Sequence, residues 1–228
     1  MSDLLQRLCR KLDYSFRDAA LLTKALTHRS HGAGNNERLE FLGDALINFV
    51  IGDALYGSCP KAEEGALSRL RASLVREETL ADLARELQLG EVLNLGESEL
   101  KSGGFRRDSI IADALEAVVG AIYLDSGFDS TRAVVLKLYA PLLANLPDPD
   151  TLKDAKTRLQ EWLQAQARPL PHYEVLSESG PPHRREFLVR CSVADGEQTA
   201  EASGTSRRVA QQRAAEMMLK NLSGAEHA

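Results

Sequence analysis

The residues most suggestive of chemistry form an acidic line inside an apolar segment. From Asn36 to Ala45 the sequence reads NERLEFLGDA, with carboxylates at Glu37, Glu40 and Asp44. The spacings i, i+3 and i+7 place these three groups along one face of a helix, beside apolar residues. Two carboxylates about 6 Å apart repel by roughly 3 kcal/mol at an effective dielectric of about 20. The cluster is therefore expected to take up protons or to hold a cation.

A second acidic pair stands in another apolar segment. Asp113 and Glu116 lie at i and i+3 within residues 108–119, for which Asp108 is the predicted N-cap. Packed together, the two helices would form a box of carboxylates. Oxygen ligands with open positions for water suit Mg²⁺ or Mn²⁺, whereas zinc prefers His or Cys, which do not occur here at ligand spacing. One acidic pair is more often a solvated structural feature, but five acids on two apolar helices favour a metal site for phosphate chemistry.

Composition indicates an ordinary soluble globular protein. The chain has 228 residues, 43% hydrophobic and 27% charged, enough for one large or two modest domains. Its longest run without Asp, Glu, Lys or Arg, Leu138 to Pro147, is too short for a bilayer span, and no apolar signal core begins the chain. Cys9, Cys59 and Cys191 are too far apart to indicate a disulfide framework or a zinc site. We expect a cytoplasmic protein with no membrane partner.

Charge is distributed unevenly along the chain. Residues 1–150 carry 17 Lys and Arg against 23 Asp and Glu, a balance of −6, whereas residues 151–228 carry 11 against 10, a balance of +1. Much of the acid in the first part belongs to the predicted metal site, where bound cations would offset it. The overall charge therefore does not exclude a nucleic-acid partner.

The first part of the sequence predicts an all-α domain in residues 1–146. Helical apolar periodicity occurs in segments 3–11, 18–27, 36–57, 63–88, 108–125 and 130–144. The stretch from Gly90 to Gly104 is expected to be a break, and residues 147–152, rich in Pro and Asp, are predicted to be a linker.

The second part predicts a small α+β domain in residues 153–223 with the order αβββα, followed by a tail at 224–228. The expected helices cover 153–167 and the segment from about Ser206, and the expected strands are 173–176, 186–193 and 198–203. In the first helix Leu159 and either Trp162 or Leu163 should face the core. In the last helix Ala210, Ala214 and Met218 should form the buried stripe.

The segment from Asn36 to Ala45 resembles the signature of the bacterial ribonuclease III family, whose members cleave double-stranded RNA. The resemblance extends to Glu63-Glu64-Gly65, to residues 101–107 and to the helix of Asp113 and Glu116, and it covers nearly the whole chain. The domain predicted in residues 153–223 is similar to the double-stranded RNA-binding domain, because Gly204 to Ala210 resembles its basic helix start.

For the RNA-binding surface the chain offers polar and basic side chains that suit an A-form duplex. A helix N-terminus with Arg207 and Arg208 suits phosphate, whereas Thr157, Gln160 and Gln164 share a face that can reach 2′-hydroxyls. His183 matches the loop that the family inserts into a neighbouring minor groove. The sequence departs from the family pattern at Ala202, where a glycine is expected, and at Gln211, which is often a third basic residue.

The resemblance implies an Mg²⁺-dependent endoribonuclease, with Mn²⁺ as a substitute, that leaves 5′-phosphate and 3′-hydroxyl ends with short 3′ overhangs. It assigns metal binding to Glu40, Asp113 and Glu116, and catalysis to Asp44 together with Glu116. It assigns a supporting acidic role to Glu37 and Glu64. It also implies a homodimer formed through the signature helix, no action on DNA, and processing of ribosomal RNA precursors and other structured transcripts.

Two other functions compete with this hypothesis. A non-catalytic dimer could bind structured RNA without cutting it, although such a protein would not need a cation site. A helical phosphohydrolase acting on small phosphates could carry an unrelated tail, in which case deletion of residues 151–228 would leave its activity unchanged. Adjacent acids such as Glu63 and Glu64 at a helix start often only interact with the helix dipole.

Overall fold

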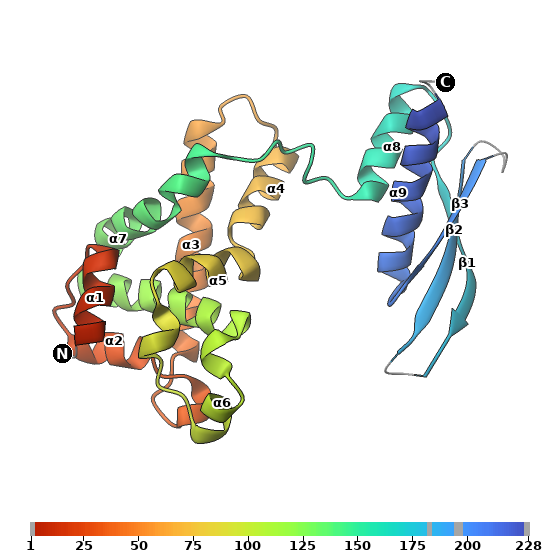
Figure 1. Ribbon diagram of the computed structural model, residues 1–228. Helices are drawn as coiled ribbons and strands as arrows, with labels where there is room; N and C mark the ends of the chain where they lie inside the picture. The colour runs from red at the N-terminus through yellow and green to blue at the C-terminus, as the bar shows by residue number, and fades with distance from the viewer. Residues whose placement is uncertain (1–2, 182–183, 194–197, 226–228) are drawn as a thin grey trace. The chain divides into compact units, whose positions relative to one another are not determined.

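The computed structural model describes residues 3–181, 184–193 and 198–225, with side chains to Ser223. It divides into two compact units, Met1–Leu152 and Lys153–Ala228, which are described separately (Figure 1). The division falls at the end of the segment predicted to be a linker. Before it, the Arg69 side chain donates a hydrogen bond to the Pro149 carbonyl oxygen (3.2 Å), so this part of the segment is attached to the first unit.

The first unit is all-α, as predicted, among the residues described. Its α-helices are α1 (Asp3–Leu12), α2 (Ala19–Ala25), α3 (Glu37–Ser58), α4 (Glu64–Leu74), α5 (Glu77–Glu86), α6 (Glu97–Lys101) and α7 (Asp108–Ala144). Short 3₁₀ helices occupy Arg29–His31, Leu89–Val92 and Gly104–Arg106. The expected break from Gly90 to Gly104 therefore contains helical turns that are too short to give a periodic pattern.

Helix boundaries differ from the sequence predictions at three places. The segment 63–88 is two helices rather than one, because Arg76 is extended (ψ 156°) and caps α5. Segments 108–125 and 130–144 both lie in α7, which is interrupted by non-helical backbone at Gly127 (φ 79°). The prediction of Asp108 as N-cap is wrong: Arg107 occupies that position, and Asp108 begins the helix and accepts a hydrogen bond from Arg85 instead.

The centre of the first unit is the crossing of α3 and α7, visible in Figure 1 where the orange helix is crossed by the green one. Two glycines make the close approach possible. A Cβ atom on Gly43 of α3 would overlap the Glu116 carbonyl oxygen of α7, and a Cβ on Gly120 of α7 would overlap the Leu39 carbonyl oxygen of α3. Buried aliphatic residues such as Ile47 surround this crossing. The backbones of the two acidic helices therefore touch without side chains between them.

The second unit has the predicted αβββα order. Helix α8 (Ala155–Ala165) precedes strands β1 (His172–Ser179), β2 (Glu186–Val193) and β3 (Gln198–Gly204), and α9 (Arg207–Ala225) ends the unit. The described strands form an antiparallel sheet in the order β1-β2-β3, with Val189 of β2 opposite Val175 and Ala202. Both helices cover one face of the sheet (Figure 1).

The core of the second unit matches the predicted stripe. Ala210, Ala214 and Met218 of α9 are fully buried, as are Leu159 and Leu163 of α8. The sequence left open whether Trp162 or Leu163 faces the core. In the structure Leu163 faces the core, whereas Trp162 packs at its edge. Alternate residues of β2, from Phe187 to Val193, complete this core.

The crossing gives a first testable prediction. Replacing Gly43 with Ala forces α3 and α7 apart, which costs about 1–3 kcal/mol of unfolding free energy, and the gain in helix propensity of about 1 kcal/mol offsets only part of it. The matched control is Gly52→Ala on the same helix, where a Cβ would lie 3.8 Å from the Arg71 side chain, an ordinary contact. Urea unfolding should show a lower unfolding free energy than the wild type for Gly43→Ala and no decrease for Gly52→Ala. Equal stabilities of the two variants would contradict the close crossing.

Candidate metal centre

Three carboxylates converge where α3 crosses α7. Glu40 of α3 and Asp113 and Glu116 of α7 each offer an oxygen atom, and the three oxygens lie within 4.8 Å of one another. The i, i+3 spacing puts the two α7 acids on one side of that helix, and the contact at Gly43 brings this side against α3. All three residues are half-buried. These are the residues for which the sequence predicted metal binding.

Burial and the repulsion of nearby carboxylates raise the pKa of each carboxyl group. For Glu116 burial is the larger cause, and the charges of Asp44, Asp113 and Glu40 add to it, so that its pKa rises to about 8. Burial also raises the pKa of Glu40, with a contribution from the charge of Asp113. Burial and then the charge of Glu77 raise the pKa of Asp113. Without a cation Glu116 therefore retains a proton at neutral pH.

No basic side chain neutralises this cluster among the residues described. Neither Glu40, Asp113 nor Glu116 has a Lys or Arg nitrogen within 4.0 Å. The nearby Arg29 guanidinium forms its ion pair with Glu37 at 3.7 Å. Its charge lowers the pKa of Glu40, but burial outweighs this effect and the net pKa is raised. Three convergent carboxylate oxygens without a cationic partner fit a hard divalent cation such as Mg²⁺ or Mn²⁺.

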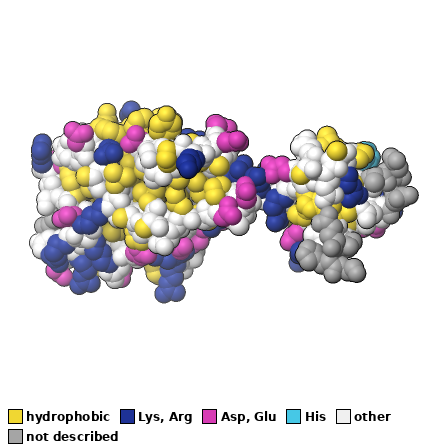
Figure 2. All heavy atoms as spheres, turned by 90° about the horizontal axis from the view of Figure 1, so that it is seen from above, with side chains coloured by type: hydrophobic (Ala, Val, Ile, Leu, Met, Phe, Trp, Pro, Cys, Tyr) yellow, Lys and Arg dark blue, Asp and Glu magenta, His cyan; other side chains and the backbone are white. Residues whose placement is uncertain are grey.

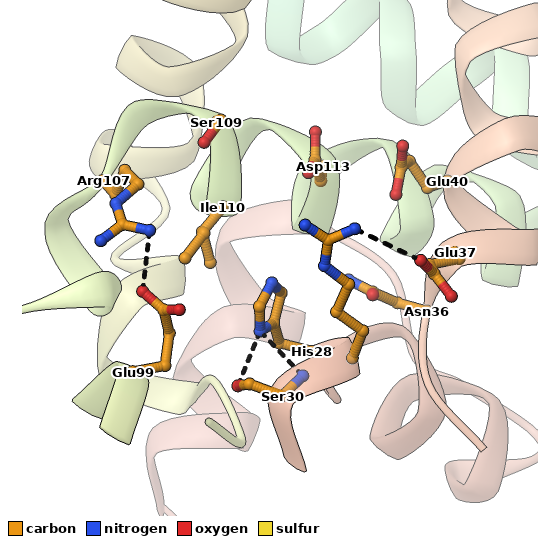
Figure 3. A pocket seen from close by; sticks show the side chains of 11 residues that line it. His28, Ser30, Asn36, Glu37, Glu40, Glu99, Arg107, Ser109, Ile110 and Asp113 are labelled. Carbon is orange, nitrogen blue, oxygen red and sulfur yellow. Dashed lines mark hydrogen bonds and ion pairs between the residues drawn. The ribbon is translucent and has the colours of Figure 1, made fainter. Parts of the chain in front are cut away.

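A pocket of about 400 Å³ opens beside these carboxylates. Figure 3 shows Glu40 and Asp113 side by side on its wall, with Glu99 and Arg107 at the other end, joined by an ion pair of 2.9 Å. The pocket thus combines acids that can hold a cation with a basic side chain. Its lining residues are His28, Arg29, Ser30, Asn36, Glu37, Glu40, Glu99, Arg107, Ser109, Ile110 and Asp113.

The remaining predicted acids occupy different positions. Asp44 lies outside the group of three but close enough for its charge to raise the pKa of Glu116, and its carboxylate accepts a hydrogen bond from Asn48 (2.8 Å). Glu37 lines the pocket one turn before Glu40, whereas Glu64, at the start of α4, is in neither the group nor the pocket. Glu64 instead accepts a hydrogen bond from Ser68 (2.7 Å).

Sequence reasoning missed several residues around the carboxylates. Glu77, at the start of α5, affects the pKa of Asp113, and His28 and Arg29 come from the connection between α2 and α3. His28 is 9% exposed, and its Nδ1 accepts a hydrogen bond from the Ser30 backbone N–H (3.2 Å). The available signal was the polar run of residues 27–30 between two helices, which has no periodicity to indicate where it packs.

In the second unit the predicted RNA-binding residues lie on α8 and at the start of α9. Gln160 and Gln164 are exposed, and Thr157 is half-buried, with its backbone N–H bonded to the Asp154 carboxylate (2.9 Å). Arg207 is exposed, lies 3.4 Å from Glu178 and covers the Phe187 ring. Arg208 is exposed as well. His183 lies outside the described residues.

Surface charge on the first unit is mixed rather than uniformly acidic. On the face shown in Figure 2, Lys and Arg side chains are interspersed with Asp and Glu. No helix among the described residues has the length and apolarity that a membrane span requires.

Comparison with known proteins agrees with this geometry. Residues 18–143 match the family model described as Ribonuclease-III-like, and residues 155–222 match the double-stranded RNA binding motif. A Ribonuclease 3 from Hahella chejuensis is 55% identical over 219 residues, which cover 96% of this chain and 97% of the relative. The chain belongs to the ribonuclease III family. The family resemblance and the two-part fold predicted from the sequence are confirmed.

Other members of the ribonuclease III family are also similar to this chain over most of their length. A Ribonuclease 3 from Pseudomonas aeruginosa is 57% identical over 215 residues, 94% of each chain. The solved nuclease domain of the Campylobacter jejuni ribonuclease III is 41% identical, with a TM-score of 0.61, and covers 64% of this chain and 100% of that one. The protein is thus an endoribonuclease of the ribonuclease III type, with a nuclease domain for double-stranded RNA. This membership favours the nuclease hypothesis over both alternatives.

The raised pKa of Glu116 predicts how stability depends on pH. Because the folded state holds a proton from about pH 4.5 to about pH 8 that the unfolded state has released, unfolding free energy should fall as pH rises through that window when EDTA is present. A divalent cation at about 100 times its Kd should restore about 2.7 kcal/mol.

Urea unfolding at pH 5 and at pH 8 measures this dependence. Glu116→Gln should make it shallower, whereas Glu86→Gln, an exposed position on α5, should leave it as in the wild type. A wild-type stability that is independent of pH in EDTA would contradict the assignment of Glu116.

Proposed function

We propose that this protein hydrolyses phosphodiester bonds of double-stranded RNA in a reaction that depends on Mg²⁺, for which Mn²⁺ substitutes. The products carry 5′-phosphate and 3′-hydroxyl ends with short 3′ overhangs. The observation that carries the proposal is the convergence of Glu40, Asp113 and Glu116 within 4.8 Å in a unit matched by the ribonuclease III family. Three half-buried carboxylates without a basic partner suit a cation better than any structural role.

The acids divide into three groups by the task proposed for them. Glu40, Asp113 and Glu116 hold the cation, and Asp44, exposed at the edge of the group, orients the attacking water. When bound, Mg²⁺ lowers the pKa of water and offsets charge that develops on the phosphoryl oxygens. Glu37 and Glu64 support the site from outside the group of three.

Basic residues from the end of α6 to the start of α7 contribute to substrate binding, and one of them, Arg107, lines the pocket. Arg107 directly precedes α7, and the exposed Lys101 and Arg106 end α6 and the 3₁₀ helix Gly104–Arg106, where these side chains can contact the RNA backbone. In the second unit Thr157, Gln160, Gln164, His183, Arg207 and Arg208 bind the duplex. An A-form helix is recognised through such phosphate and 2′-hydroxyl contacts.

A homodimer explains how both strands are cut. One site cuts one strand, so a double-strand break needs two sites. Large apolar side chains stand exposed along α3 at Phe41 (80%), Phe49 (62%) and Tyr56 (76%), a surface suited to self-association with two-fold symmetry. For the nuclease domain of the Campylobacter jejuni enzyme, 43% identical, flexibility is described in a region involved in dimer formation.

The biological setting is also a proposal. We propose that the protein works in the cytoplasm on ribosomal RNA precursors and other structured transcripts, and does not cleave DNA. A support for this setting is that the full-length relatives from Hahella chejuensis and Pseudomonas aeruginosa are bacterial and carry the same name, Ribonuclease 3.

Glu116→Gln tests the catalytic proposal. The substitution removes a carboxylate ligand with little change of shape, so cleavage of a labelled RNA duplex in Mg²⁺ should fall by about 10²-fold or more, while duplex binding in Ca²⁺ is retained. Glu86→Gln should cleave as the wild type does, and single-stranded RNA and DNA serve as substrate controls. A Glu116→Gln protein with wild-type cleavage would contradict the assignment, and a wild type that binds duplex but never cuts it would contradict the function.

Phe41→Asp tests the dimer. A buried charge in an apolar contact is costly, so sedimentation should show a dimer for the wild type and a monomer for this variant. Leu100→Asp, which changes an exposed apolar residue on α6, should remain dimeric. A wild type that sediments as a monomer and still makes double-strand breaks would refute the proposal.

A further inference from the structure

The Lys156 side chain in the first turn of α8 is held in one place by two contacts. Its ammonium nitrogen donates a hydrogen bond to the Gln211 side-chain oxygen of α9 (2.8 Å) and lies 4.4 Å from the centre of the Tyr173 ring on β1. The Lys156 backbone N–H also donates to the Gln212 side chain (3.2 Å). A flexible lysine is thus fixed between α8, α9 and the sheet.

This ammonium group has no anionic partner among the residues described. No carboxylate oxygen lies within 4.0 Å of it, although Lys156 is half-buried. The nearest acid along the chain, Asp154, already accepts hydrogen bonds from the Thr157 backbone (2.9 Å) and the Gln212 side chain (3.0 Å). A half-buried cation with one neutral hydrogen-bond partner retains unused donors, and desolvating it is costly unless an anion completes its surroundings.

The position of the ammonium group matters because of its neighbours on α9. Gln211, its hydrogen-bond partner, occupies the position that is often a third basic residue in this type of domain. Arg207 lies one helical turn earlier on the same face of α9, and Arg208 follows it. The charge that α9 lacks at Gln211 is therefore present 2.8 Å away, supplied by α8.

We propose that Lys156 is a phosphate-binding residue of the second unit and provides, from α8, the cation that Gln211 does not. An RNA phosphate oxygen accepts a hydrogen bond from the Lys156 ammonium, beside the phosphate contacts of Arg207. Gln211 and Tyr173 position the ammonium group before RNA arrives, which reduces the entropy lost on binding. This inference rests on the proposed binding of duplex RNA.

The experiment measures duplex affinity as a function of salt. Each phosphate contact contributes about 0.9 to the slope of log K against log salt concentration. With full-length protein in a Glu116→Gln background and no divalent cation, Lys156→Gln should weaken binding by about tenfold and reduce that slope by about 0.9. Lys220→Gln is the matched control, because Lys220 on α9 already pairs with Glu216 at 3.1 Å, and it should leave the slope unchanged.

A charge-relocation variant separates phosphate binding from a purely structural role. Lys156→Gln combined with Gln211→Lys places the ammonium on α9 and should restore both slope and affinity. If Lys156 only braces α8 against α9, Lys156→Gln will lower the melting temperature and leave the slope unchanged, and the proposal is overturned. A parent protein that fails to bind duplex RNA would instead refute the proposed function, so the two failures are distinguishable.

Discussion

The contact between α3 and α7 determines where every carboxylate of the centre lies. Gly43 meets the backbone of Glu116, and Gly120 meets the backbone of Leu39, so the two helices cross with no side chain between them. Residues far apart in the sequence, Glu40 and Asp113, thereby reach the same few ångströms. A larger residue at either glycine would move α3 and α7 apart and so separate the acids, although every carboxylate would still be present. The small residues are therefore as necessary to the site as the ligands.

The same crossing creates an electrostatic cost that a cation can relieve. Burial and repulsion raise the pKa of all three acids, and their protons or a cation must balance the charge. Surrounding residues such as Ile47, Leu115 and Val118 are fully buried, and this apolar packing lowers the local dielectric and strengthens attraction to a cation. The core thus stabilises the fold and also increases the cluster's preference for a divalent ion.

How much of this could be predicted from sequence depends on how local each feature is. Helical periodicity is local, so the spacing of Glu40, Asp113 and Glu116 was sufficient to predict their convergence once two apolar helices pack. Other residues near the carboxylates were not predictable in this way, because His28 comes from the connection between α2 and α3, and Glu77, whose charge raises the pKa of Asp113, comes from α5. A choice between Trp162 and Leu163 likewise needs the sheet, since both lie near the same face of α8. The Asp108 prediction failed because a distant arginine, Arg85, competes for that carboxylate.

The most direct test of the central claim is to locate a bound ion. Crystals of the full-length protein soaked in Mn²⁺ would give an anomalous scattering peak for each ordered ion. A metal centre at the α3 and α7 crossing should give a peak bounded by oxygens of Glu40, Asp113 and Glu116, which disappears in Glu116→Gln crystals treated identically. An ordered Mn²⁺ bound elsewhere, with these three carboxylates left without an ion at saturating concentration, would contradict the claim that the α3 and α7 crossing builds a metal centre.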